Sequence, residues 1–523
     1  MKVALAQLNY TIGDFESNKV KIINAINRAK ADGADMAVFA EEAVSGAPAY
    51  GLLDRVTFLE ASEDALIEIA SFCDDITVIV GLPIMNDCKT FSAAAVIHNR
   101  KIIRYVTRKN IYQREDVGFI SSGGGSEIVV INGKRIAVVV GEDALCCDEY
   151  SSVVDLVVNI HSSKYARQRI EKRYDKLSQF AFQLGADYLT VNLVGGSTDI
   201  IYDGSSAVFN SKGEPLALLA SFEEDYAVVD LDNARPVEIP YQNKTANVYR
   251  AIKLGLSDFF FKNGYRSACL GLSGGIDSAV VAAVAAEVLG PDNVHVLLMP
   301  SQFSSDHSVD DALEMVRNLG LRHDIVSITD VYTQILDVLS PVFGDDTDFG
   351  VTEENIQARI RSVLLMALSN KFGHVLLNTT NKSELALGWY TLYGDSVGML
   401  SVLGDVYKSE VFDIAHWINR DREIIPENII RKAPSAELRP EQKDTDYLPP
   451  YDETDSIIYR MIEERQTLEE IINAGYDPDV VLKIAGMIRK NEPKRFQFCP
   501  ILRVATSTFG VNRKMPLTSR CRY

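Results

Sequence analysis

The octapeptide at residues 271–278, Gly-Leu-Ser-Gly-Gly-Ile-Asp-Ser, constrains the fold more than any other stretch of the chain. Residues 268–272 form a short apolar run of the kind that builds a buried parallel strand. Residues 279–289 are strong helix formers, and Gly290-Pro291 ends them. The pattern predicts a strand, a glycine-rich turn and a helix N-terminus. Such a junction binds phosphate, because backbone N–H groups and the helix dipole face the anion.

The loop differs from the nucleotide loop of kinases and GTPases, since it has no Gly-Lys-Ser/Thr ending. Asp277 stands in place of that lysine. A carboxylate at this point suits Mg²⁺ bound to a leaving pyrophosphate, because hard cations prefer oxygen ligands. We therefore interpret the junction as a functional phosphate site rather than an ordinary strand–turn–helix connection.

The length and composition limit the remaining possibilities. A chain of 523 residues exceeds one core, so two or three domains are expected. The hydrophobic content of 47% is that of a soluble globular protein, and no apolar run is long enough to span a membrane. Seven cysteines form neither a disulfide framework nor a zinc pattern, and no signal peptide is recognisable. We expect a cytoplasmic protein with no membrane partner.

The charge of the chain is strongly acidic, at −19. This balance argues against a nucleic-acid partner, which would require a basic face. It also means that local groups must hold any polyanionic nucleotide, because the overall field repels it.

The chain reads as two α/β halves joined by a linker. Residues 236–248 contain proline and little periodicity, so they are predicted as the linker between domains 1–235 and 249–523. Upstream, the pattern predicts sheets layered with helices. Downstream, strands alternate with helices, which predicts a doubly wound parallel sheet with its ligand at the carboxyl strand ends. The strand candidates are residues 3–8, 36–39, 77–80, 93–97, 102–106, 136–140, 156–160, 188–194, 268–272, 295–299, 324–328 and 374–377.

Polar residues that fit one chemistry follow these strands in the second half. Thr379 and Glu384 come after the strand at 374–377, and Glu384 can complete a Mg²⁺ site with Asp277. Asp395 and Lys408 offer an acid and a base near the same rim.

Two further segments of the second half contribute candidates. A helix that starts near Thr352 is expected to turn Asn355 away from its apolar face, which comprises Ile356, Ile360, Val363, Leu364 and Ala367. Lys494 lies in the basic run 490–495, which suits a phosphate or a carboxylate.

Six ordered motifs between residues 249 and 510 resemble those of NAD⁺ synthetases in the N-type ATP pyrophosphatase superfamily. They are Ser273–Ser278, Glu354–Arg361, Thr379–Glu384, Leu392–Asp395, Ser435–Pro440 and Asn491–Arg495. The resemblance implies amidation of deamido-NAD⁺ through an adenylate, with ATP as co-substrate, Mg²⁺ as cofactor and a homo-oligomeric assembly.

The same resemblance implies roles for individual residues. Those expected to bind ATP are Gly271, Leu272, Ser273, Gly274, Gly275, Ile276, Asp277, Ser278, Thr379 and Lys408. Those expected to contact deamido-NAD⁺ are Asn355, Glu384, Trp389, Asp395 and Lys494, and the metal ligands are Asp277 and Glu384.

The first half resembles the nitrilase, or carbon–nitrogen hydrolase, domain that feeds ammonia to glutamine-dependent NAD⁺ synthetases. The resemblance implies an α-β-β-α sandwich with Glu41 as general base, Lys109 as catalytic lysine and Glu115 as accessory glutamate. It also implies that Ser163 and Arg169 hold glutamine.

The nucleophile of that family does not appear in this chain. The family has a strand followed by Cys-Glu-Asp, whereas residues 136–143 end in Gly141-Glu142-Asp143. Glycine tolerates the tight elbow but offers no thiolate for acyl transfer. Cys146 and Cys147 lie too far along the chain to replace it without rebuilding the segment. We therefore expect ammonia, not glutamine, to be the nitrogen source.

Two alternatives stay open at this point. One is another amidotransferase of the pyrophosphatase superfamily, such as GMP synthetase. The other is a non-catalytic nucleotide-binding pseudoenzyme, although every proposed ATP and metal position carries a chemically competent residue.

Overall fold

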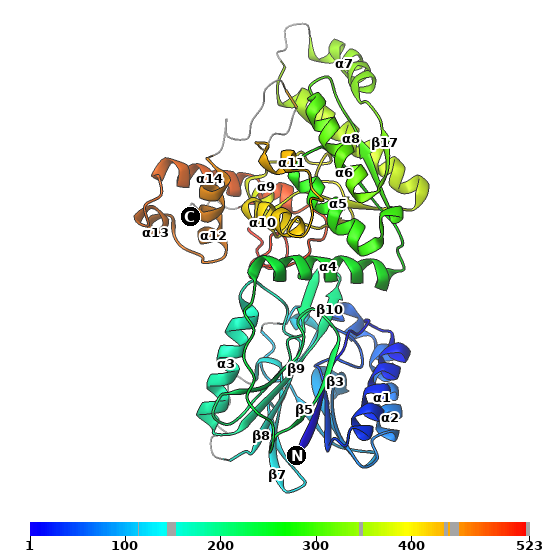
Figure 1. The fold of residues 1–523 in the computed structure, drawn as a ribbon, viewed down its shortest axis with the longest axis vertical. Helices are drawn as coiled ribbons and strands as arrows, with labels where there is room; N and C mark the ends of the chain where they lie inside the picture. The colour runs from blue at the N-terminus through cyan, green and yellow to red at the C-terminus, as the bar shows by residue number, and fades with distance from the viewer. Residues whose placement is uncertain (113, 144–152, 345–348, 434–437, 440–448, 519–523) are drawn as a thin grey trace. The chain divides into compact units, whose positions relative to one another are not determined.

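The computed structural model describes residues 1–112, 114–143, 153–344, 349–433, 438–439 and 449–518. The chain divides into two compact units, residues 1–243 and 244–523 (Figure 1). Helix α4 (Lys244–Asn263) opens the second unit and begins inside the stretch 236–248 that was expected to be a linker. No helix in these described ranges combines the length and the apolar character needed to cross a membrane.

The first unit is a sandwich of two six-stranded sheets. Helices α1 (Phe15–Ala31) and α2 (Val56–Ser71) lie beside one sheet and α3 (Arg169–Leu184) beside the other (Figure 1). This arrangement confirms the predicted α-β-β-α fold. In sheet order the strands are β14 (Asp225–Asp230), β1 (Lys2–Gln7), β2 (Met36–Phe39), β3 (Thr77–Asn86), β4 (Lys89–His98) and β5 (Lys101–Thr107), and then β13 (Pro215–Leu218), β12 (Ala207–Phe209), β9 (Asp187–Asn192), β8 (Leu156–His161), β7 (Lys134–Val140) and β6 (Glu127–Ile131).

One apolar core fills the space between these sheets. Leu5, Val38 and Val158 are fully buried in it, because inward-facing side chains of both sheets are apolar. Strands β1, β2 and β3 run parallel, whereas β3, β4 and β5 form hairpins. A separate two-stranded sheet pairs β10 (Val194–Ser197) with β11 (Ile200–Asp203).

The second unit is built on a five-stranded parallel sheet, which confirms the predicted doubly wound architecture. Its order is β17 (Arg322–Ile325), β16 (Val294–Leu298), β15 (Ala268–Gly271), β18 (Val375–Asn378) and β19 (Leu400–Ser401). The chain moves outward from β15 to β17 and then returns to β18 on the other side of β15. This reversal is a topological switch point, where doubly wound sheets bind their ligands.

Helices cover the sheet, and α5 (Ile276–Leu289) is buried on nearly all sides, as its uniformly apolar sequence requires. The remaining helices of this unit, not all of which lie on the sheet, are α6 (Asp306–Leu319), α7 (Thr329–Phe343), α8 (Val351–Phe372), α9 (Lys382–Leu387), α10 (Lys408–Ile418), α11 (Glu427–Arg431), α12 (Tyr451–Ile462), α13 (Leu468–Asn473), α14 (Pro478–Lys490) and α15 (Glu492–Arg495).

A buried ionic network ties the C-terminal segment to α9. Lys382 has no exposed surface, and its Nζ lies 2.8 Å from Asp405 and contacts Glu463. The other carboxylate oxygen of Asp405 accepts hydrogen bonds from the backbone of Val504 and Ala505 and from the Thr508 hydroxyl. Through Asp405 and Lys382 the segment therefore fixes α9, the helix that carries the predicted site residue Glu384.

Candidate active site

The glycine-rich loop between β15 and α5 has a shape that only glycine at position 274 permits. Gly274 has a φ of +76°, and a Cβ there would lie 2.3 Å from the backbone oxygen of Ser308. An L-residue would therefore suffer both backbone strain and a collision. The loop and the start of α6 can pack this closely because no side chain separates them.

Two serines fix the loop from inside. Ser278 Oγ donates to the Gly275 carbonyl at 3.0 Å and accepts from the Ser273 amide at 3.3 Å. Ser273 Oγ accepts from the Gly275 amide at 3.2 Å. Helix α5 starts at this point without a side-chain cap, so its first N–H groups remain available to an anion.

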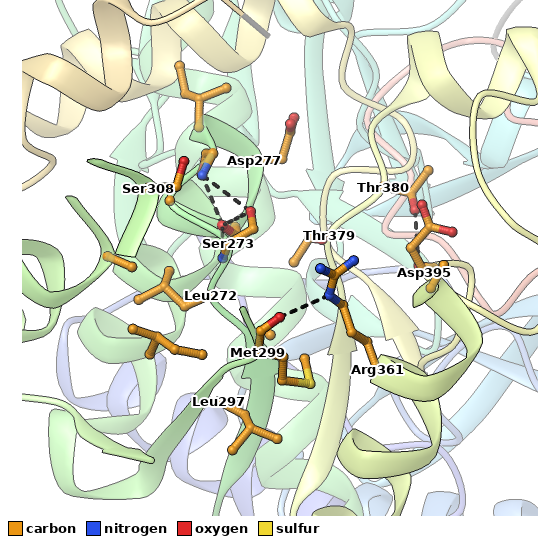
Figure 2. A pocket seen from close by; sticks show the side chains of 18 of the residues that line it. Leu272, Ser273, Asp277, Leu297, Met299, Ser308, Arg361, Thr379, Thr380 and Asp395 are labelled. Carbon is orange, nitrogen blue, oxygen red and sulfur yellow. Dashed lines mark hydrogen bonds between the residues drawn. The ribbon is translucent and has the colours of Figure 1, made fainter. Parts of the chain in front are cut away.

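The loop opens into a cavity of about 310 Å³ at the carboxyl ends of the strands. Figure 2 shows Asp277, Thr379, Arg361 and Asp395 around it. The predicted residues that line it are Gly271–Ser278, Thr379, Glu384, Trp389, Asp395 and Lys408, and Asn355 and Lys494 do not belong to the lining.

Two carboxylates of the cavity share one cation. Lys408 Nζ contacts Asp277 and lies 3.4 Å from Glu384 Oε1. Asn381 caps α9 by accepting from the Glu384 amide at 3.0 Å, and it donates to Asp277 Oδ1 at 2.9 Å. Because both carboxylates converge on the same positive group, this pair fits a divalent cation that is also bound by phosphate oxygens and water. Within the described ranges, no cluster of three or more His, Cys, Asp or Glu side chains surrounds a metal position.

Two further cations line the cavity, and sequence reasoning did not assign them a role. Arg361 donates from Nε to the Met299 carbonyl at 3.1 Å, and Lys432 contacts the Ser308 hydroxyl. With Lys408 they bring three positive side chains near the loop, which offsets the acidic charge of the chain locally. Helical spacing holds a signal for Arg361, because Ala358, Arg361, Ser362 and Leu365 of α8 all line the cavity.

The apolar face predicted for the same helix is only partly correct. Ile360 is buried, but Val363 is 66% exposed and Ala367 is exposed as well. The face turned inward instead includes Gln357 and Ser362, because it packs beside a polar cavity.

Asn355 and Lys494 lie behind the cavity wall. Asn355 Oδ1 accepts from the Thr391 hydroxyl at 2.7 Å, and the Thr391 amide donates to Asp395 at 2.6 Å. Lys494 Nζ donates to the carbonyls of Gly388 and Tyr390, both at 2.7 Å. Partial burial lowers the pKa of Lys494 below its usual value.

Two residues of the basic run 490–495, Lys494 and Arg495, donate hydrogen bonds to backbone carbonyls of the protein itself. The buried Arg495 donates to the carbonyls of Leu385 and Ala386 near the end of α9, at 3.1 and 2.7 Å. The run therefore completes the end of a helix, which its composition did not reveal. Of the predicted motif Ser435–Pro440, only Leu438 and Arg439 lie within the described residues.

In the first unit, Glu41 is fully buried just beyond β2. Its carboxylate accepts hydrogen bonds from Ser92 (2.9 Å), Arg108 (2.9 Å), Arg114 (2.6 Å) and Ser162 (2.6 Å). Burial alone would raise the pKa of Glu41, but Arg108 and Arg114 outweigh it and hold that pKa well below its ordinary value.

The structure does not bring Lys109 to Glu41, contrary to the expectation. The Lys109 side chain is exposed, and its backbone amide donates to Asp143 at 2.7 Å. Arg108, its neighbour, faces Glu41 instead, because adjacent residues of an extended chain point to opposite sides. Glu115 pairs with Lys164, and Arg169 donates to the Lys164 carbonyl at 3.0 Å. Ser163 is buried, and its backbone amide donates a hydrogen bond to Asn192 Oδ1 at 2.7 Å.

Gly141 follows β7 directly and also has left-handed backbone, with a φ of +60°. A Cβ there would lie 2.4 Å from both Cζ and Nη1 of Arg108. Glycine is therefore the residue that this elbow accommodates. Cys146 and Cys147 lie outside the described residues.

Comparisons with known proteins match each of the two units to a protein family. The NAD synthase family matches residues 248–497, and the carbon–nitrogen hydrolase family matches residues 2–241. The chain is 39% identical to the glutamine-dependent NAD(+) synthetase of Synechocystis, over 98% of each chain. The chain belongs to the glutamine-dependent NAD(+) synthetase family. Its members are ligases that form a carbon–nitrogen bond. Membership therefore favours an NAD(+) synthetase over the two alternatives, a GMP synthetase and a non-catalytic pseudoenzyme.

Two further relatives of the glutamine-dependent NAD(+) synthetase family extend the match. The enzyme of Thermotoga maritima is 38% identical over 99% of each chain. The solved structure of the Acinetobacter baumannii enzyme, in complex with adenosine diphosphate, has a TM-score of 0.79 at 34% identity. It covers 99% of this chain and 98% of that one, so both units are shared.

Proposed function

We propose that the second unit makes NAD⁺ from deamido-NAD⁺ by ATP-dependent amidation, with ammonia as the direct nitrogen source. The observation that carries this proposal is the convergence of the loop 271–278, two carboxylates and three cations in one cavity. A triphosphate needs such groups, because the chain as a whole is acidic. The relative from Acinetobacter baumannii was solved in complex with adenosine diphosphate, which supports an adenine nucleotide as a ligand of this chain.

The first step is adenylation. The nicotinate carboxylate of deamido-NAD⁺ attacks the α-phosphorus of ATP, and the bond from that phosphorus to pyrophosphate breaks. The loop N–H groups, Lys408, Arg361 and Lys432 oppose the negative charge of the phosphates. Mg²⁺, when held by Asp277 and Glu384, would neutralise charge on the departing pyrophosphate.

The second step is amidation. Ammonia attacks the acyl carbon of the adenylate, the bond to AMP breaks, and one proton is released as the amide forms. No protein nucleophile is needed, so positioning and exclusion of water provide the acceleration.

The nitrogen source follows from the first unit. A glutaminase of the carbon–nitrogen hydrolase type transfers the acyl group to a thiolate, and we propose that Gly141 occupies that nucleophile's position. Without a thiol, glutamine cannot form the thioester through which its ammonia is released.

An amidation assay tests the proposal. With MgATP and deamido-NAD⁺, ammonium should support formation of NAD⁺, AMP and pyrophosphate, whereas glutamine alone should support almost none. Adding a separate glutaminase should restore the glutamine-driven reaction, which controls for inhibition by glutamine itself. Robust turnover with glutamine alone would contradict the assignment of ammonia, and absence of pyrophosphate release with ammonium would contradict the amidation itself.

A further inference from the structure

The position of the Arg108 guanidinium beside Gly141 carries an inference about the first unit. We propose that the Arg108 side chain fills the space that a nucleophile at position 141 would need, so that this unit is closed to glutamine by its own guanidinium. The inference rests on the proposed function and deepens it. Lack of a thiol is then only one of two obstacles to glutamine hydrolysis.

The guanidinium of Arg108 is held on several sides. Nη1 donates to both oxygens of Glu41, at 2.9 and 3.1 Å, and Nε donates to the Asn110 carbonyl at 2.6 Å. Nη2 forms an ion pair with Glu142. The side chain is only 2% exposed. Arg108 therefore cannot swing into solvent to make room without abandoning these partners.

The space beside Gly141 is correspondingly full. Cζ and Nη1 of Arg108 lie 2.4 Å from the ideal Cβ position and Nε lies 2.8 Å from it, all inside the 3.0 Å limit that real Cβ atoms respect. Any side chain at position 141 would displace the guanidinium. That displacement would leave the buried Glu41 with a weaker counter-charge, which is costly in a protein interior.

The ion pairs that Arg108 and Arg114 form with Glu41 also remove Glu41 from base chemistry. A general base works best when its pKa lies near the working pH. Because Arg108 and Arg114 hold the Glu41 carboxylate ionised, its pKa lies well below the ordinary value and it retains little tendency to take a proton. The position expected to hold the general base is therefore part of a buried ion-pair cluster.

Thiol labelling of the full chain tests this closure directly. The variant Gly141→Cys is compared with Gly141→Cys/Arg108→Lys, in which lysine keeps a positive charge for Glu41 but lacks the planar fork. Alkylation by iodoacetamide is followed by peptide mass spectrometry that separates the new thiol from Cys146 and Cys147. We expect the new thiol to react at least about tenfold faster in the double variant. Equal labelling rates in the two variants would overturn the proposal.

A thermal cycle decides the question even if the introduced thiol impairs folding. Melting temperatures are measured for the unmodified chain, Gly141→Ala, Arg108→Lys and the double variant. The strain of alanine at a positive φ is present with either residue at position 108, so only the collision appears as coupling. We expect Arg108→Lys to recover at least about 3 °C of the loss caused by Gly141→Ala. Purely additive losses would overturn the proposal.

The amidation assay separates failure of this inference from failure of the proposed function. Glutamine-driven NAD⁺ synthesis by the unmodified chain would disprove the assignment of ammonia, whatever the labelling rates. If only ammonium supports synthesis, but labelling is equal and the cycle additive, the closure by Arg108 is wrong and the ammonia assignment stands. Ammonium-driven synthesis by each variant serves as the control that the second unit has folded.

Discussion

At the scale of single residues, two glycines with left-handed backbone mark the two candidate sites. The space beside Gly141 is filled by the side chain of Arg108, whereas the space beside Gly274 is filled by the backbone of Ser308. Substitution of Arg108 can relieve the collision at position 141. At position 274 no substitution removes the colliding atoms, because they belong to the backbone of Ser308. The two positions should therefore respond differently to added bulk, and position 274 should be the less tolerant.

The substitution Gly274→Ala should disable the phosphate loop. Its methyl group would push the loop away from α6, and a displacement near 1 Å at a positioning site costs about 10²-fold in rate. We expect ammonium-driven pyrophosphate release to fall by at least that factor. Gly320→Ala is the matched control, because Gly320 has a similar φ of +70° but open space around its Cβ position. Comparable losses in both variants would show that backbone strain, not the Ser308 contact, is responsible.

The residue scale also shows where sequence reasoning stops. The loop 271–278 was predictable because a strand, a glycine turn and a helix are contiguous in the chain. The choice between Arg108 and Lys109 was not, since it depends on where the alternation of β5 ends. Arg361 was also missed, because nothing local says which face of α8 meets the strand ends. The predicted apolar face was wrong at Val363 and Ala367 for the same reason.

At the scale of elements, one buried carboxyl joins three helices of the second unit. Asp455 of α12 accepts from the Ser383 hydroxyl of α9 and from the Ser409 amide of α10 at 2.9 Å. The Ser383 hydroxyl in turn accepts from the Lys408 amide at 2.9 Å. This connection fixes the start of α10, and with it the cation that bridges the two cavity carboxylates.

Burial raises the pKa of Asp455 from 3.8 to about 6. The folded state therefore favours the protonated carboxyl, and the resulting stability is fully present below pH 3.8 and lost as the pH rises through 6. The size of this contribution is about 3 kcal/mol. In Asp455→Asn it is absent, so the unfolding free energy of wild type relative to the variant should fall by about that amount between pH 4 and pH 7.

Urea unfolding at pH 4, 5.5 and 7 measures this difference. Asp479→Asn at an exposed position of α14 is the control, because this substitution removes no buried carboxyl. A flat difference for Asp455→Asn would show that its carboxyl titrates in the folded chain as it does in the unfolded one.

At the scale of the whole molecule, an acidic chain places three cations where a nucleotide would bind, and they offset the carboxylates Asp277, Glu384 and Asp395 of the same cavity. The net charge is −19, yet Arg361, Lys408 and Lys432 line one cavity. Fold class was predictable because patterning over many strands and helices averages local errors. The end of the linker was harder, since residues 244–248 carry no clear periodicity although α4 already includes them.

The network around Lys382 makes the C-terminal segment part of this arrangement. In Asp405→Asn the buried ammonium loses one of its two carboxylates, and breaking such a pair costs about 3–5 kcal/mol. Chemical unfolding should show a loss in that range. The exposed pair of Glu427 and Arg431 offers the control, and Glu427→Gln should cost less than about 1 kcal/mol. Similar losses in the two variants would mean that the buried network contributes no more than a surface pair.

The hydrogen bonds from residues 503–509 to Asp405 limit how far the chain can be shortened at its C-terminal end. None of these residues lines the cavity. A nonsense mutation or proteolytic cut just ahead of them would nevertheless remove the hydrogen bonds that hold Asp405. Asp405 pairs with Lys382, which lies between Asn381 and Glu384 in the sequence. A chain shortened in this way would lose activity as a substitution in the site does, although it still contains every residue that lines the cavity.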